Sequence, residues 1–418
     1  MFVALAALLW ANSPWAQTYF DLWQHELRFS IGSWYVFSHG GHPFSILNFI
    51  NDALMAVFFF LTALEIKREA LVGELSSVRQ ASLPILAACG GMIVPVAVFY
   101  FVARGTPAEA GIAVPMATDI AFSLGVLSLF GKRVPLSLKI FLTTFAVADD
   151  IGGILVIAFF YTSHLSWFHL LLAAGVLAIL WVGNWRGIHT RWFYLGFGLV
   201  LWYLFLQGGI HATIAGVILA FTIPATPSLR KRREMQAKCE TTCEILPEAT
   251  PATAPATVRS TVRTEEDCAN SPLQTLTTLL TLPVAYLIMP IFAFANAGVA
   301  ILRPDGGIEF GEASLGIILG LVVGKFVGIY LFTVFALKYK LANLPTGMTY
   351  KNLTGICMLG GVGFTVALFI AQLSFADPNL LAQAKIGVVG GTAIAGLLGY
   401  ILLNATLPKL PKSSKQAK

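Results

Sequence analysis

Apolar runs long enough to cross a lipid bilayer recur along the whole chain, and this recurrence limits its possible folds more than any other feature. Only 11% of the 418 residues are charged and 57% are hydrophobic, whereas a soluble protein has about 25% charged residues. So few charges could not cover a surface in water. The composition excludes a soluble enzyme and a nucleic-acid-binding protein, and it predicts an all-α polytopic membrane protein.

We predict about twelve transmembrane helices from the positions of these runs. The first is short, but no basic residue precedes it, so we interpret it as a helix rather than a signal peptide. The predicted spans are 1–12, 48–65, 83–103, 109–130, 137–160, 166–184, 192–207, 209–224, 275–299, 313–337, 352–374 and 382–407.

The distribution of lysine and arginine predicts the orientation of these spans, because cytoplasmic loops of membrane proteins are enriched in both residues. With twelve spans, nearly all basic loop residues fall on the side of the two chain ends, which we therefore place in the cytoplasm. The exceptions on the opposite side are Arg28, Arg104, Arg303 and Lys385.

A polar linker divides the chain into spans 1–8 (residues 1–224) and spans 9–12 (residues 273–407). Residues 225–272 begin with a basic cluster at 230–233 and continue into a Pro/Ala/Thr tract without periodicity, so we expect a disordered cytoplasmic loop. We interpret the cluster as a positive-inside signal; contact with anionic lipid head groups is the alternative. Residues 408–418 form a basic cytoplasmic tail.

Four ionisable residues stand out within predicted spans, away from the span ends, where a charge costs about 2.5–3.5 kcal/mol and usually has a function. They are Asp119, Asp149, Asp150 and Lys325. The adjacent carboxylates of Asp149 and Asp150 repel each other at low dielectric, which favours an exchange of protons for a cation. Oxygen ligands suit small hard cations, so the pair predicts a site for Na⁺ or Li⁺. Lys325 has a structural alternative, an ion pair with Asp149 that fixes helix packing.

Two spans carry residues that interrupt helices. Pro115 lies within 109–130, next to Thr118 and Asp119, and several glycines lie within 352–374. A pair of interrupted spans in corresponding parts of two halves is typical of a transporter site. Broken helices expose charged ends, so Asp119 could offset the positive ends and Lys325 the negative ends. The alternative is that Asp119 has only a structural role and fills the helix break with a polar side chain.

Six long motifs resemble the NhaA-type sodium/proton antiporters, a family that is itself an example of inverted repeats in transporters. The resemblance covers about residues 48–407 and implies inverted repeats with two discontinuous helices that cross at mid-membrane. The motifs are INDALMAVFFFLTALEIKRE (50–69), VPMATDIAFSLGVLSLFGKRVP (114–135), FAVADDIGGILVIAFFYT (145–162), GIHATIAGVILAF (209–221), LPVAYLIMPIFAFANAGV (282–299) and GLVVGKFVGIYLF (320–332).

The resemblance implies a secondary active transporter, not an enzyme, that extrudes Na⁺ or Li⁺ in exchange for external protons by alternating access. Such exchange is electrogenic, with two H⁺ per Na⁺, and serves sodium and pH homeostasis in the bacterial inner membrane. In this reading Asp150 is the principal cation ligand and proton carrier. Asp149 is the second titrating carboxylate and pairs with Lys325, while Thr118 and Asp119 support the break.

Four further positions match those that set the pH response of the family: Glu65, Arg68, Glu69 and His211. The first three could equally be charge pairs at a helix end, and His211 could be structural. The start of the ninth span, 274–283, lacks the acidic residue and histidines that the family commonly has there, which leaves the pH midpoint open.

No cofactor is expected besides the transported ions, and the expected partners are membrane lipid and possibly a second copy of the chain. Residues 13–47 occupy the place of a family hairpin that supports dimer contact, and 29–39 look strand-like. A sodium-coupled symporter, a channel and an intramembrane aspartyl protease are the alternative functions. They fit less well, because few other polar groups, no filter loop and no Gly-x-Gly-Asp pattern accompany the aspartates.

Overall fold

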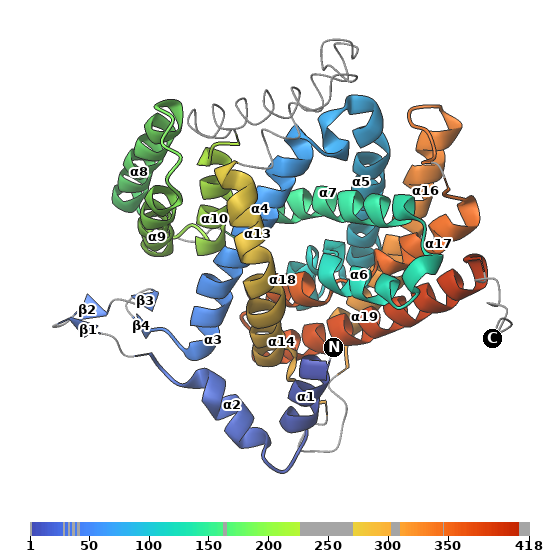
Figure 1. Ribbon diagram of the computed structural model, residues 1–418. Helices are drawn as coiled ribbons and strands as arrows, with labels where there is room; N and C mark the ends of the chain where they lie inside the picture. Colours follow the sequence, from blue (N-terminus) through green and yellow to red (C-terminus); the bar gives the residue numbers. More distant parts are fainter. Residues whose placement is uncertain are drawn as a thin grey trace, which may run out of the picture. The chain divides into compact units, whose positions relative to one another are not determined.

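The computed structural model describes residues 2–27, 30–31, 34–35, 38–39, 42–161, 165–225, 271–301, 310–345 and 347–408. Within these ranges the regular secondary structure is helical apart from two short antiparallel hairpins and an isolated bridge between Glu26 and Ser45 (Figure 1). The hairpins pair β1 (Ser30–Ile31) with β2 (Trp34–Tyr35) and β3 (Ser38–His39) with β4 (His42–Pro43). The strand-like 29–39 stretch thus supplies very short strands to both hairpins.

The α-helices are α1 Phe2–Ala11, α2 Ala16–Gln24, α3 Ile46–Phe49, α4 Met55–Leu71, α5 Val78–Ala103, α6 Ile120–Ser128, α7 Leu136–Phe160, α8 Trp167–Trp185, α9 Arg191–Gly208, α10 Ala212–Thr222, α13 Pro272–Pro283, α14 Met289–Ala297, α15 Glu312–Leu319, α16 Lys325–Lys338, α17 Tyr350–Leu359, α18 Phe364–Ser374 and α19 Pro378–Thr406. Short 3₁₀ segments occur at Glu74–Ser76, Pro107–Gly111, Val114–Met116 and Gly131–Arg133. Single π-helical turns occur at Ile50–Leu54, Val284–Ile288 and Gly320–Gly324, each inside a longer continuous helix.

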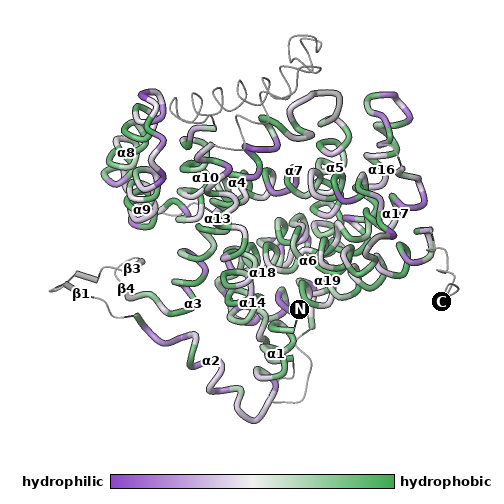
Figure 2. Tube along the Cα trace, in the orientation of Figure 1, coloured by the Kyte–Doolittle hydropathy of each residue, from purple (hydrophilic) through white to green (hydrophobic). Residues whose placement is uncertain are grey.

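The helices confirm a polytopic membrane protein. In the described ranges, seven helices are long and apolar enough to cross a membrane, or nine if each of two bent helix pairs forms one span. The remaining predicted spans correspond to α1 and α10, which are shorter apolar helices, and to α9, which has 18 residues. Figure 2 shows the hydrophobic residues along most of these helices.

The chain forms two compact units, each assembled from separate stretches of sequence. Unit 1 comprises Met1–Leu22, Ser77–Ile157 and Ala293–Lys418, and unit 2 comprises Trp23–Ser76 and Ala158–Phe292. Unit 1 takes residues from both sides of the linker, so the compact units do not follow the division of the sequence at that point. Residues 226–270 of the predicted loop and 409–418 of the predicted tail lie outside the described residues.

Unit 1 is held together by close helix packing that depends on glycine. Helices α5 and α16 lie side by side (Figure 1), and a Cβ atom added to Gly90 would lie only 2.3 Å from the carbonyl oxygen of Gly328. Because small residues let two backbones approach closely, such contacts are typical of helices packed within a membrane.

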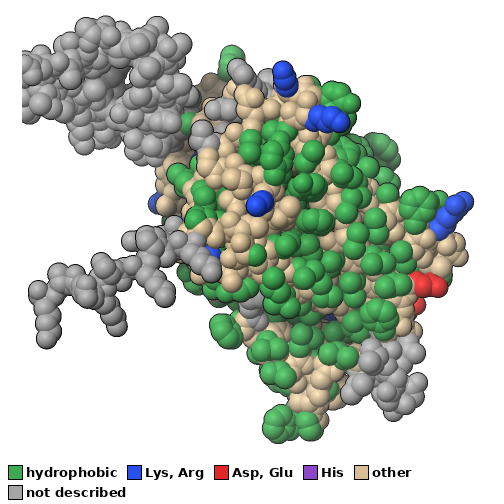
Figure 3. Space-filling model, turned by 90° about the vertical axis from the view of Figure 1, so that its right-hand side faces the viewer, with side chains coloured by type: hydrophobic (Ala, Val, Ile, Leu, Met, Phe, Trp, Pro, Cys, Tyr) green, Lys and Arg blue, Asp and Glu red, His purple; other side chains and the backbone are tan. Residues whose placement is uncertain are grey.

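One face of the molecule, which includes side chains of α16 and α19 in unit 1, is apolar. Figure 3 shows this face largely covered by hydrophobic side chains, with the few lysines and arginines lying apart from one another. Leu331 and Phe335 of α16 and Leu397 and Ile401 of α19 are each more than half exposed. An apolar surface of this extent is unfavourable in water and favourable against lipid chains.

In unit 2, α4 packs against α10 and α13, and α8 packs against α9. The ammonium group of Lys67 donates hydrogen bonds to the carbonyl oxygens of Phe221 (2.7 Å) and Ile223 (2.6 Å), and so caps the end of α10. This contact complements the partial negative charge at a helix C-terminus.

Candidate ion-binding site

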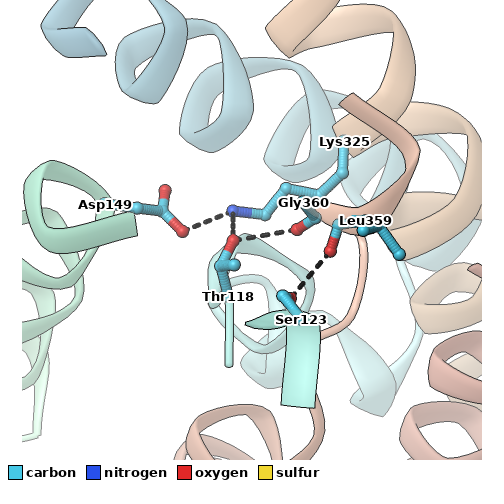
Figure 4. Close-up of polar contacts among 6 residues, drawn as sticks. All are labelled: Thr118, Ser123, Asp149, Lys325, Leu359 and Gly360. Atoms are coloured by element: carbon cyan, nitrogen blue, oxygen red, sulfur yellow. Dashed lines mark hydrogen bonds and ion pairs between the residues drawn. The ribbon is translucent and has the colours of Figure 1, made fainter. Parts of the chain in front are cut away.

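Two helices of unit 1 are broken, and the two breaks cross each other. Pro107–Met116 and Ile120–Ser128 meet at an angle of 49°, and α17 and α18 meet at 42°. At the crossing, the amide of Asp119 donates to the carbonyl oxygen of Val362 at 2.7 Å. The hydroxyls of Thr118 and Ser123 donate to the carbonyls of Gly360 and Leu359, at 2.8 and 3.0 Å (Figure 4). The prediction of two broken spans that cross is confirmed.

The local sequence explains why the helices break here. Pro115 lacks the amide hydrogen that a continuous helix would use. In the second break, a Cβ atom on Gly361 would lie 2.2 Å from the carbonyl oxygen of Leu321, and one on Gly363 would lie 2.9 Å from that of Ala117. Only glycine allows the backbone to pass this close.

Asp119 joins the first turns of two half-helices. Its side chain is 1% exposed, and one carboxylate oxygen accepts a hydrogen bond from the amide of Phe122 in α6 at 3.1 Å. The other oxygen accepts from the amide of Thr365 in α18 at 3.0 Å and from the Thr365 hydroxyl. One carboxylate therefore compensates the positive ends of both α6 and α18, which confirms the expected position of Asp119 at the positive ends.

Lys325 connects this crossing to α7. The lysine is fully buried, and its ammonium group donates to Asp149 Oδ2 at 2.6 Å and to Thr118 Oγ1 at 2.9 Å (Figure 4). Because Thr118 donates onward to the carbonyl of Gly360, which caps the end of α17, Lys325 reaches a negative helix end through the threonine. The predicted pairing of Lys325 with Asp149 is confirmed.

The two adjacent aspartates are both buried in α7. Asp149 is 2% exposed and Asp150 is 5% exposed. Asp149 Oδ1 is buried and accepts no hydrogen bond from any described residue. A buried carboxylate oxygen without a donor is placed to take a proton or a small cation.

The residues assigned to the pH response lie in unit 2 and fall into two places. Glu65, Arg68 and Glu69 lie within about one turn of α4, and Arg68 pairs with Glu69 at 3.3 Å. His211 precedes α10, and its Nε2 lies 3.9 Å from Oδ1 of Asp52. Asp52 precedes Glu65 by about 20 Å along the same helix, so the structure does not bring His211 to the other three.

Sequence reasoning did not single out Ser123 and Thr365, which hold the crossing together. Thr365 lies two residues after Gly363 in the glycine-rich motif, and Ser123 lies one turn after Asp119. A hydroxyl residue within the first turn after a predicted helix break is the local signal that could have identified both.

Comparisons with known proteins agree along nearly the full length. A family model described as Na⁺/H⁺ antiporter 1 matches residues 1–403. The Na(+)/H(+) antiporter NhaA of Phocaeicola vulgatus is 56% identical over 416 residues, covering 98% of this chain and 93% of that protein. The protein of the same name from Bacteroides fragilis is 52% identical over 413 residues, covering 97% and 94%.

The fold also has a relative among solved structures. The sodium proton antiporter MjNhaP1 from Methanocaldococcus jannaschii, solved at pH 8, superimposes with a TM-score of 0.50 at 12% identity, over 97% of this chain and 91% of that one. At this identity the likeness concerns the fold alone. The family model and the two NhaA relatives decide the classification: the chain belongs to the Na⁺/H⁺ antiporter 1 family.

Proposed function

We propose that this chain exchanges Na⁺ or Li⁺ for H⁺ across a membrane, with Asp149 and Asp150 as the cation ligands and proton carriers. The observation that carries the proposal is a pair of adjacent buried carboxylates, of which Asp149 pairs with the buried Lys325, next to two crossing helix breaks. The names of the NhaA relatives support the choice of Na⁺ and H⁺. Thr118 and the crossing carbonyls supply further oxygen atoms of the kind that small hard cations prefer.

The geometry supports alternating access by exchange of partners at Asp149. Without a cation, the ammonium group of Lys325 neutralises Asp149. A sodium ion at the two aspartates displaces this contact, and the loaded site turns outward. Outside, protons displace Na⁺, and the protonated carboxylates return to the cytoplasmic side. No step needs ATP, because the proton gradient drives the cycle.

Two protons per sodium ion would make the exchange electrogenic. Each cycle would carry one net positive charge inward, and a membrane potential of 100 mV contributes about 2.3 kcal/mol per charge moved. The same proposal places the protein in a bacterial inner membrane with both termini in the cytoplasm, as the lysine and arginine distribution favours. Its role there would be sodium and pH homeostasis, and a homodimer is part of the proposal.

Asp150→Asn is expected to abolish the exchange, because asparagine keeps the size of the side chain but can neither release a proton nor neutralise Na⁺. Inverted membrane vesicles with a fluorescent ΔpH indicator would be energised, and Na⁺ would be added from pH 6.5 to 8.5. Wild type should collapse ΔpH on Na⁺ addition, and Asp150→Asn should not. The control is Asp21→Asn, an exposed aspartate of α2. A wild-type protein that never responds to Na⁺ or Li⁺ would contradict the proposal.

We further propose that Glu65, Arg68 and Glu69 shape the pH response. In this proposal, activity depends on protons that bind to the two glutamates. Glutamine can neither bind nor release these protons, so replacing both glutamates removes them from the pH dependence of activity. The rise of activity with pH should then become shallower, with a maximal rate within about twofold of wild type, because ion-binding residues are untouched. The control is Glu109→Gln, an exposed glutamate of unit 1. A pH profile that superimposes on wild type would assign the cluster to helix stability alone.

A further inference from the structure

The helix that carries Lys325 is not a regular α-helix immediately before this residue. Residues Gly320–Gly324 form a single π-helical turn between α15 and α16. The amide of Lys325 donates its hydrogen bond to the carbonyl of Gly320, five residues earlier. In an α-helix this amide would bond to Leu321, four residues earlier. The π turn therefore leaves the carbonyl of Leu321 without the Lys325 amide as its donor.

This irregularity changes the direction of the lysine side chain. Successive residues of an α-helix are rotated by about 100°, and a π turn takes one extra residue into a turn. All side chains after the turn are therefore rotated relative to those of α15, and Lys325 is the first residue after it. With this rotation, the ammonium group contacts both Asp149 and Thr118.

The turn packs closely against two prolines, which is possible because its glycines lack a Cβ atom. A Cβ on Gly324 would lie 2.6 Å from the Cα atom of Pro95 in α5. A Cβ on Gly320 would lie 2.5 Å from Cβ of Pro115, three residues before Thr118. Real Cβ atoms do not approach other atoms this closely, so any side chain at these glycines would push the turn away from its neighbours.

The carbonyl that loses its usual donor faces the second helix break. A Cβ atom on Gly361 would lie 2.2 Å from the oxygen of Leu321, so the glycine backbone passes directly over this carbonyl. The π turn thus contacts the α5 proline, the first break and the second break at once.

We propose that the π-helical turn Gly320–Gly324 is a positioning element for Lys325, and that Gly320 and Gly324 are the positioning residues that seat it against Pro115 and Pro95. The inference rests on the proposed function for its effect on transport. Its structural part, the coupling between the turn and the Lys325–Asp149 pair, is independent of transport.

The first test measures transport. Gly324→Ala should lower the apparent KM for Na⁺ about tenfold at a fixed alkaline pH, because Na⁺ no longer has to displace one charge-assisted hydrogen bond between Lys325 and Asp149. The maximal rate should change less, because no ion ligand is removed. Gly125→Ala and Gly153→Ala are matched controls in the same unit, since an added Cβ meets no atom within 4 Å at either position. A KM for Gly324→Ala within twofold of both controls would overturn the inference.

The second test measures thermal stability of the purified protein in detergent as a double-mutant cycle. Lys325→Met should lower the unfolding temperature of wild type and of Gly153→Ala by the same amount. In the Gly324→Ala background the decrease should be at most half as large, because the lysine is already displaced from Asp149. Additive decreases would show that the turn does not position the lysine.

If Gly324→Ala does not yield folded protein, Gly320→Ala can replace it in the same double-mutant cycle. The Cβ atom added at Gly320 meets a proline ring atom, whereas the one added at Gly324 meets a backbone Cα atom. The two proposals can fail separately. If wild type shows no Na⁺-dependent proton movement, the proposed function fails, while the stability cycle still decides the positioning role. If wild type exchanges ions but the cycle is additive, only the positioning role fails.

Discussion

Asp119→Ala is expected to lower the stability of unit 1 by about 3–9 kcal/mol, because three donors would lose their acceptor and each buried donor left without one costs about 1–3 kcal/mol. The substitution would remove the acceptor of the Phe122 amide and of both the amide and hydroxyl of Thr365. It would also remove the negative charge between two positive helix ends. A loss of this size is a large part of the total stability of a typical protein. The measurement is the unfolding temperature of the purified protein in detergent, together with the amount of folded protein in the membrane.

Asp119→Asn separates the two contributions. Asparagine is nearly as good a helix N-cap as aspartate, so it should keep most of the stability through its side-chain oxygen. It carries no charge, so any remaining loss reports the interaction with the helix ends. If Asp119→Ala unfolds at the wild-type temperature, the carboxylate does not hold the crossing together, and Asp119 would have to act in transport directly.

Lys325→Met is expected to lower stability by about 3–5 kcal/mol, because it leaves the Asp149 carboxylate buried without its partner. The double change Lys325→Met with Asp149→Asn should recover much of this loss, since two neutral side chains of similar size replace the ion pair. Both expectations concern the unfolding temperature in detergent and hold whether or not the protein transports ions.

The pair of Arg68 and Glu69 is the matched control for this prediction. Their side chains are 38% and 17% exposed, and an ion pair with this access to solvent contributes about 0–1 kcal/mol. Arg68→Met should therefore change the unfolding temperature little. If Lys325→Met is no more destabilising than Arg68→Met, or if the double change is worse than the single one, the buried pair is not a coupled unit.

The spans, the two breaks and the ionisable residues of the site could be predicted from the sequence, because each follows from a local signal. A long apolar run predicts a span, Pro115 and the glycines at 360, 361 and 363 predict breaks, and a charge within an apolar run stands out against its surroundings. The pairing of Lys325 with Asp149 was predicted as the structural alternative for the lysine, and the family resemblance implied the same pair.

The contacts that build the site could not be predicted in the same way. Thr365 is 246 residues from Asp119, and no local pattern encodes a partner at that distance. The π turn before Lys325 depends on how Gly320 and Gly324 seat against two other helices, which hydropathy does not report. The α2 helix, Ala16–Gln24, was likewise not predicted, because its residues lack a long apolar run.

The long separations within the site have a consequence for the synthesis of the protein. Lys325 follows Asp149 by 176 residues, and Thr365 follows Asp119 by 246. At about 5–20 residues per second, Asp119 is made about 12–50 s before its second helix end exists. During this time the nascent chain holds carboxylates in or near the bilayer without their partners, at about 2.5–3.5 kcal/mol each. The site is therefore completed only late in synthesis, and a chain that ends before residue 360 lacks the second break and the Thr365 donors to Asp119.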